Sequence, residues 1–340
     1  MPITLTEKLP ANLKELFGIV KGLGIDHQAL FKIPTTPAKE KFVRKNAPVL
    51  TQHLTPSMRH TLTSVAKKLR NPAGNLRLNY PLDFPENRLI RDATQDGSMK
   101  PWWGKSAAVC ITHDIDNAKG MSQVASFAKM NLRAGVKATF NFLTHAEYRL
   151  EKLLLHDLMT EGFEIGLHGF DHDQGYAFRP REAMLTKLKL ALFALRDFNI
   201  GGYRSPALSL SETLFAAIGE MGLRYDSTLQ IASPFYHSVR LPYPVYLAPY
   251  GLWELPLMVQ DDSYLRDARC DEGTILNSLN RFIQETQALN GVFVLNVHPH
   301  NFAERAPLYR EILELIRSAD VAVVTMSEVV DYVEDHTDHK

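Results

Sequence analysis

The chain has 340 residues, of which 45% are hydrophobic and 22% are charged, and its 38 basic and 38 acidic side chains cancel. This composition predicts a globular protein, with room for one large α/β domain and an extension, and it excludes a disordered chain. No apolar run approaches the roughly 18 residues that a transmembrane helix needs, and two cysteines, Cys110 and Cys270, are too few for a disulfide framework.

The charge is unevenly distributed along the chain. Residues 1–105 contain 17 Lys and Arg against 8 Asp and Glu, a balance of +9, and the remainder contains 21 against 30, a balance of −9. Residues 41–82 contain eight basic and no acidic side chains. We expect this basic stretch to contact an anionic membrane surface, a phosphorylated sugar carrier or the acidic part of the chain. A solvated basic face is the plainer alternative.

The motifs that the sequence lacks bear on its expected partners and on its expected compartment. The sequence has no helix-turn-helix, zinc-finger or RNA-binding motif, so nucleic acid is not an expected partner. Its first residues lack the charged and then apolar pattern of a signal peptide, so we expect a cytoplasmic protein, with peripheral contact to the inner face of the membrane as an option.

The first hundred residues read as a mostly helical extension. Apolar spacing within residues 1–30 predicts one helix, and residues 56–70 form a second candidate helix with a basic polar face. Residues 80–85 contain two prolines, Pro81 and Pro85, and we expect this segment to be extended. We therefore predict a basic, partly helical extension over residues 1–104 and a second domain over residues 105–335.

After residue 105, strand-like and helix-like patterns alternate. Such alternation predicts parallel strands covered by helices. The expected strands are 107–112, 137–143, 163–167, a strand ending at Arg204, 223–226, 292–297 and 320–325. The expected helices are 120–133, 149–161, 180–198, a helix capped by Ser211 that reaches Met221, 273–289, 306–318 and one final helix. A loop with five prolines is expected between residues 234 and 256.

Two motifs follow predicted strands and contain typical metal ligands. His168 and His172 are four residues apart after one apolar run, and Asp114 and Asp116 follow another. Taken alone, the first motif is often a pair of ordinary histidines and the second is often a turn. At strand ends of one α/β chain, together with His298 after a later apolar run, they indicate a divalent metal site, because imidazole and carboxylate ligands suit zinc.

The order of these motifs resembles the polysaccharide deacetylases of carbohydrate esterase family 4, which share the NodB-homology domain. The resemblance covers about residues 105 to 330. It rests on the following motifs: Thr112-His113-Asp114-Ile115-Asp116, His168-x-x-x-His172, Tyr203-Arg204-Ser205-Pro206, Tyr225-Asp226-Ser227, Trp253-Glu254-Leu255-Pro256, and the apolar strand that leads to His298. It implies a distorted (β/α)7 barrel, the NodB-like deacetylase fold, after the N-terminal extension.

The resemblance also implies which residues hold the metal. Ile115 stands where the usual first motif has its metal-binding aspartate, so we expect Asp116 to take that role, as in variants with an Asp-x-Asp motif. The metal, Zn²⁺ or another divalent transition metal, would then bind Asp116, His168 and His172 and keep open positions for water and substrate.

The remaining motif residues receive expected roles in hydrolysis. Asp114 would be the general base, or alternatively a second metal ligand, and His298 would be the general acid, or alternatively a structural histidine. Arg204 would orient Asp114. Asp226 would orient His298 or Arg204. Trp253 and Pro206 would line the substrate pocket, although a tryptophan in an apolar strand is more often part of a core.

These expectations converge on a metal-dependent hydrolase that removes the acetyl group from an N-acetylated sugar. Its substrate would be lipid-linked or nucleotide-linked, in the biosynthesis of a surface polysaccharide or glycoconjugate. One alternative is an amidohydrolase that opens a small cyclic imide or ureide. A second alternative is a catalytically inactive, metal-containing protein that only binds carbohydrate.

Overall fold

The computed structural model describes residues 85–94, 98–231, 238–239, 241–262 and 270–337, together with the single positions Leu16, Ile19, Gly22, Leu23 and Leu265. The helix expected in residues 56–70 and the basic stretch 41–82 lie outside the described residues, as do nearly all of residues 1–30 and 80–85. The predicted domain boundary after residue 104 therefore stays a prediction.

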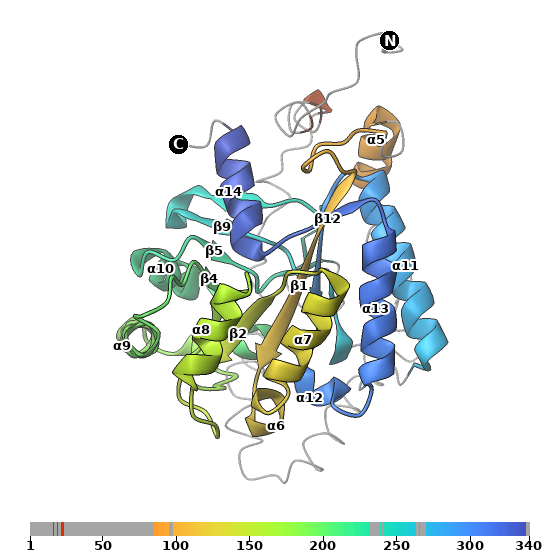
Figure 1. Cartoon of the computed structure of the whole chain (residues 1–340). Coiled ribbons are helices and arrows are strands. Elements are labelled where there is room, and N and C mark those ends of the chain that lie inside the picture. The colour runs from red at the N-terminus through yellow and green to blue at the C-terminus, as the bar shows by residue number, and fades with distance from the viewer. Residues whose placement is uncertain are drawn as a thin grey trace, which may run out of the picture.

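One curled, mixed sheet forms the centre of the described part of the chain (Figure 1). Its strands follow the order β10-β11-β1-β2-β3-β4-β5-β9-β8, and β12 pairs with β1 outside this path. All neighbours are parallel except β8 and β9. The strands are β1 Ala107–Ile115, β2 Thr139–Leu143, β3 Glu164–Gly169, β4 Gly202–Tyr203, β5 Tyr225–Asp226, β8 Val245–Leu247, β9 Leu252–Glu254, β10 Val259–Gln260, β11 Val292–Asn296 and β12 Val321–Val323. A short separate pair is formed by β6 Gln230–Ile231 and β7 Ser238–Val239.

Helices cover the outside of this sheet (Figure 1). They are α5 Pro85–Thr94, α6 Ala118–Met121, α7 Val124–Ala134, α8 Lys152–Thr160, α9 Arg181–Ala194, α10 Glu212–Glu220, α11 Glu272–Ala288, α12 Pro299–Phe302, α13 Ala306–Ser318 and α14 Met326–His336. Ser211 caps α10, as predicted, by accepting a hydrogen bond from the amide of Leu214. The α/β class and the alternation of strands and helices are confirmed, and the sheet curls into a half-barrel.

The proline-rich segment between residues 234 and 256 was predicted as a loop, and this was wrong in part. It contains the antiparallel pair β8 and β9, joined by a short 3₁₀ helix, Ala248–Tyr250, and by Gly251 with φ of 65°. The prolines lie outside both strands, so they remove none of the amide donors that the pair needs. The number of prolines in the whole segment suggested a loop, although both strands of the hairpin lie between those prolines.

Strand β1 sets the direction of the sheet. All nine of its residues are buried, and it pairs in parallel with β2 on one side and with β11 on the other. The register places Asp114 beside Asn141, and Thr112 beside Asn296. Because parallel strands end at a common edge, polar residues at their carboxyl ends gather there, where α/β proteins usually place their chemistry.

The opposite edge is closed by the segment that leads into β1. The indole Nε1 of buried Trp102 donates to the carbonyl of Asn290 at 2.7 Å, and Asn290 donates to the carbonyls of Met99 and Ser106. Residues just before the first strand thus belong to the core of the described fold. Within the described residues, no helix is both long and apolar enough to cross a membrane.

Candidate metal centre

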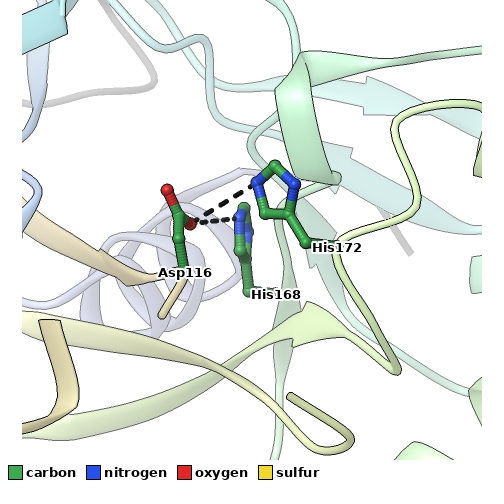
Figure 2. A group of neighbouring side chains, drawn as sticks. All are labelled: Asp116, His168 and His172. Carbon is green, nitrogen blue, oxygen red and sulfur yellow. Dashed lines mark ion pairs between the residues drawn. The ribbon is translucent and has the colours of Figure 1, made fainter. Parts of the chain in front are cut away.

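Three of the predicted metal ligands meet at the carboxyl edge of the sheet (Figure 2). Asp116 follows β1, His168 lies near the end of β3, and His172 lies four residues further along. The Oδ1 atom of Asp116 is 3.1 Å from Nε2 of His168 and 3.7 Å from Nε2 of His172. The two rings therefore turn the same type of nitrogen toward one carboxylate oxygen.

These separations fit a shared cation. Two ligand atoms that each lie about 2.1 Å from a tetrahedral zinc ion are about 3.4 Å from one another. The Oδ1 atom of Asp116 is buried, yet no donor among the described residues forms a hydrogen bond to it despite the close His168 ring. A buried carboxylate oxygen without a donor is unfavourable, and a metal ion at this point would satisfy it.

The opposite side of the His168 ring is already fixed. Its Nδ1 lies 2.9 Å from the carbonyl oxygen of Arg204 and donates to it, so the tautomer leaves Nε2 free as a ligand. Burial opposes a charge on His168, but Asp114 and Asp116 outweigh it and raise the ring's pKa. The same two negative charges would attract a metal cation.

Asp114, within β1, occupies a different environment from Asp116, which follows the strand. Its Oδ1 accepts from Nδ2 of Asn141 at 2.8 Å and lies 3.3 Å from the Arg204 guanidinium, and its Oδ2 accepts from Nδ2 of Asn296 at 2.8 Å. Burial raises the pKa of Asp114, but the positive charges of Arg204 and His168 lower it by more, so the net shift is downward. Asp114 is thus an ionised carboxylate held by amides and a guanidinium.

Arg204 lies immediately after β4 and is buried. Its Nε and one terminal nitrogen donate to the carbonyl and hydroxyl of Ser227, both at 2.8 Å, and the other terminal nitrogen donates to the Thr112 hydroxyl and toward Asp114. The structure therefore brings Arg204 and Asp114 together, as the sequence motif suggested.

His298 lies near the second carboxylate oxygen of Asp116. Its Nε2 is 3.7 Å from Oδ2 of Asp116, and its Nδ1 is 2.5 Å from Oδ1 of Asp261. Oδ2 of Asp261 also accepts the backbone amide of His298 at 3.0 Å. Burial lowers the pKa of His298, but Asp261 and Asp116 outweigh burial and raise it well above its ordinary value.

Asp226 was predicted to orient His298 or Arg204, but among the described residues it forms no direct hydrogen bond with either, and only the charge of Arg204 acts on it. Its carboxylate accepts from the amide and hydroxyl of Thr228 and lies against Glu254. The acid that holds His298 is Asp261, which the sequence analysis missed. Asp261 also follows a strand, but β10 has only two residues and is concealed in the longer apolar run that ends at Val259.

Trp253 was proposed to line the substrate pocket, and the structure places it in the core instead. It is 2% exposed, its ring packs against Tyr246, and its Nε1 donates to Glu334 of α14 at 3.1 Å. Its neighbour Glu254 points to the other face of β9, because successive residues of a strand alternate. Pro206 lies beside Gly169, where a β-carbon would meet the proline ring at 3.4 Å, and thus adjoins His168.

An open pocket of about 360 Å³ borders two of the three candidate ligands. It is lined by Asp116, Asn117, Leu143, His145, Ala146, Glu147 and His172. Asp116 and His172 belong to the ligand set, so a molecule in this pocket would reach the metal position directly. The sequence analysis did not single out His145 or Glu147, which follow β2, because neither belongs to a recurring motif.

Comparison with known sequences gives one family match. The profile of the family described as WbmS-like polysaccharide deacetylase matches residues 111–305, more than half of the chain. The matched segment runs from β1 to just before α13 and includes every residue of the candidate centre described above. No curated protein sequence matched the chain.

Comparison with solved structures identifies the fold. A candidate polysaccharide deacetylase from Mycobacterium smegmatis is similar with a TM-score of 0.57 and 20% identity, over 68% of this chain and 91% of that one. A candidate polysaccharide deacetylase from Pseudomonas aeruginosa PAO1 follows with 0.55 and 13%, over 70% and 95%. Puue allantoinase is similar with 0.53 and 12%, over 69% and 93%. At these identities the similarity concerns the fold.

Proposed function

The chain belongs to the WbmS-like polysaccharide deacetylase family, and from this premise we propose that it is a metal-dependent hydrolase that removes the acetyl group from an N-acetylated sugar. The observation that carries the proposal is the set of groups around the three ligands. Asp114 and His298 lie close to the candidate ligands, with Nδ2 of Asn296 within 3.4 Å of both, and each is held by a charged residue of its own, Arg204 and Asp261. A purely structural metal would need neither.

Asp116, His168 and His172 would hold the metal, which we propose to be Zn²⁺. When bound, it would supply Lewis-acid chemistry, which lowers the pKa of a water molecule and polarises a carbonyl group. Asp114 would accept the proton of the attacking water, and its ionised state fits this task. His298 would donate a proton to the departing nitrogen, and its raised pKa keeps the acid form available. The carbon–nitrogen bond breaks, and acetate and a free amine are released.

The substrate class is the finer part of the proposal. We propose an N-acetylated sugar carried by a lipid or a nucleotide, used in a surface polysaccharide or glycoconjugate, with the enzyme on the cytoplasmic side. A lipid carrier would give a role to the eight basic residues of the stretch 41–82, because each basic residue near an anionic bilayer contributes about 1 kcal/mol of binding.

Purified, zinc-loaded protein assayed against N-acetylated sugars, sugar nucleotides and lipid-linked sugars tests the activity. We expect equal amounts of acetate and free amine from at least one substrate. Ring opening of a cyclic ureide or imide without acetate release would instead support the amidohydrolase alternative. Saturable sugar binding without turnover, in protein with a full complement of metal, would support the inactive carbohydrate-binding alternative.

Vesicle sedimentation tests the membrane contact separately. We expect the full chain to bind vesicles rich in anionic lipid at low salt, and to bind less when Lys67, Lys68 and Arg70 are replaced by Gln. A matched control replaces Lys129, Arg133 and Lys189, which are exposed basic residues of the described domain. Absence of binding at low salt would refute membrane contact and favour a soluble, nucleotide-linked substrate.

A further inference from the structure

Two carboxyl groups, those of Asp226 and Glu254, lie side by side in the sheet. Asp226 ends β5 and Glu254 ends β9, and the two residues are direct partners in the parallel register. Both are completely buried. Two ionised carboxylates in contact inside a protein repel one another and lose hydration, so such a pair normally keeps one proton.

The hydrogen bonds favour a proton on Glu254 rather than on Asp226. Asp226 accepts two bonds from Thr228, from the amide at 2.9 Å and from the hydroxyl at 2.8 Å, and this favours its ionised form. Glu254 accepts only the amide of Leu229, at 3.1 Å through Oε1, and its buried Oε2 has no donor among the described residues. A proton on Oε2 of Glu254, donated to the adjacent Asp226, would satisfy both groups.

The charges around the pair agree with this assignment. Arg204 is the cation that faces both carboxyls, and Tyr203 on β4 is the other titratable group that faces Asp226. Burial raises the pKa of Asp226 to about 6, and burial and the charge of Asp226 raise the pKa of Glu254 well above its ordinary value. One negative charge on the pair is therefore balanced by one guanidinium.

A continuous set of hydrogen bonds connects this pair to the metal centre. The Thr228 hydroxyl, which donates to Asp226, accepts the amide of Ser205 at 3.0 Å. Ser205 follows Arg204, whose carbonyl holds the ring of His168 and whose guanidinium faces Asp114. The path from Asp226 to both groups thus runs through one short segment of backbone.

A second set of contacts leads from the same two strands to the guanidinium. Ser227, next to Asp226, accepts two hydrogen bonds from Arg204 and donates its own hydroxyl to the carbonyl of Leu255 at 2.7 Å. Leu255 is next to Glu254. Any separation of β5 from β9 at the carboxyl pair would therefore displace the groups that hold Arg204.

We propose that Asp226 and Glu254 share one proton and act as a pair of positioning residues, which lock β5 to β9 and thereby hold Arg204 where it orients both Asp114 and His168. The effect on turnover rests on the proposed function, whereas the shared proton and its effect on metal affinity do not.

Infrared spectroscopy tests the proton without any substrate. The wild-type protein in neutral buffer should show the carbonyl band of a buried, protonated carboxylic acid, and Glu254→Gln should lose it. As a control, Glu334→Gln replaces an acid on the opposite side of Trp253 and should leave the band unchanged. Identical wild-type and E254Q spectra in this region would overturn the shared proton.

Metal affinity and turnover test the positioning role. The side chain of Glu254→Gln still donates to Asp226, so this variant should keep metal affinity and turnover within about threefold of wild type. Glu254→Leu has no donor and should weaken zinc binding about 10- to 100-fold, which is the usual effect of removing a group that supports metal ligands. The value of kcat should fall with it. If E254L binds zinc and turns over like E254Q, the pair does not position the centre.

A third variant keeps the test decisive if E254L does not fold. Asp226→Asn keeps the size of the side chain but offers one acceptor oxygen to the two donors of Thr228, so it should lose metal affinity while E254Q does not. Equal metal affinity in D226N, E254Q and wild type would overturn the proposal. Absence of turnover in every protein tested, wild type included, would count against the proposed function. The infrared and zinc-binding results would remain valid.

Discussion

Asp114 and Asp116 lie two residues apart, yet their carboxylates serve different neighbours. Asp114 is 2% exposed and is held by two amides and the guanidinium of Arg204, whereas Asp116 faces the rings of His168, His172 and His298. Removal of one acid should therefore not mimic removal of the other. This difference allows metal binding and proton transfer to be tested separately.

Replacement of His168 by Ala should abolish stoichiometric metal binding, because it removes the buried ring nitrogen closest to Asp116. Elemental analysis after dialysis should give near one equivalent of metal for wild type and little for the variant. His156→Ala is a suitable control, because this ring is exposed on α8. Undiminished metal in H168A would contradict the assignment of the site.

Asp114→Asn should keep the metal and lose turnover. The amide retains the shape of the carboxylate but cannot accept a proton, and loss of a general base typically lowers the rate about 10²- to 10⁴-fold. Metal content and kcat should be measured on the same preparation. Activity within a few-fold of wild type would exclude Asp114 as the base, and loss of metal would support its alternative role as a second ligand.

His298→Ala should also retain metal and slow hydrolysis, and the loss should depend on the leaving group. A general acid matters most when the departing amine is strongly basic, so acetylated amines of graded basicity should show a graded loss. The slope of log kcat against leaving-group pKa measures this. Equal losses for all leaving groups would indicate a structural histidine.

Asp261→Asn should shift the pH dependence of kcat toward lower pH. Asp261 raises the pKa of His298, so the wild-type acid form persists as the pH rises through the range where an ordinary histidine loses its proton. Without this negative charge the pKa falls, and activity should begin to decline at lower pH. An unchanged alkaline limb, with unchanged metal content, would show that His298 does not limit the reaction.

The sequence predicted those features that depend on short, contiguous patterns. The candidate metal ligands lie at or just after the ends of buried strands, so their meeting at one edge of the sheet could be inferred from the alternation of strands and helices. The pairing of His298 with Asp261 could not, because two residues 37 apart meet only after β10 and β11 align. The strand before Asp261, β10, has only two residues and is too short to produce a recognisable alternation of apolar and polar residues.

Short strands also explain the misplacement of Trp253. Strand β9 has three residues, and an alternating pattern over three residues does not reveal which face meets the helices. Trp253 faces α14 and Glu254 faces the carboxyl edge. The larger and more conspicuous side chain suggested a binding role, while the adjacent acid, which has the unusual environment, was passed over.

The two candidate histidine ligands differ in how firmly they are held, and this bears on the kinetics of metal exchange. His168 has a side chain that is 3% exposed and anchored to the carbonyl of Arg204, whereas that of His172 is 33% exposed and borders the open pocket. A chelator would therefore enter beside His172, and rotation of this ring would set the rate at which the metal leaves. In stopped-flow measurements, His172→Ala should accelerate zinc removal far more than changes at the opposite edge of the sheet do. The site would then exchange its ion through the movement of one side chain, while the buried His168 keeps its position.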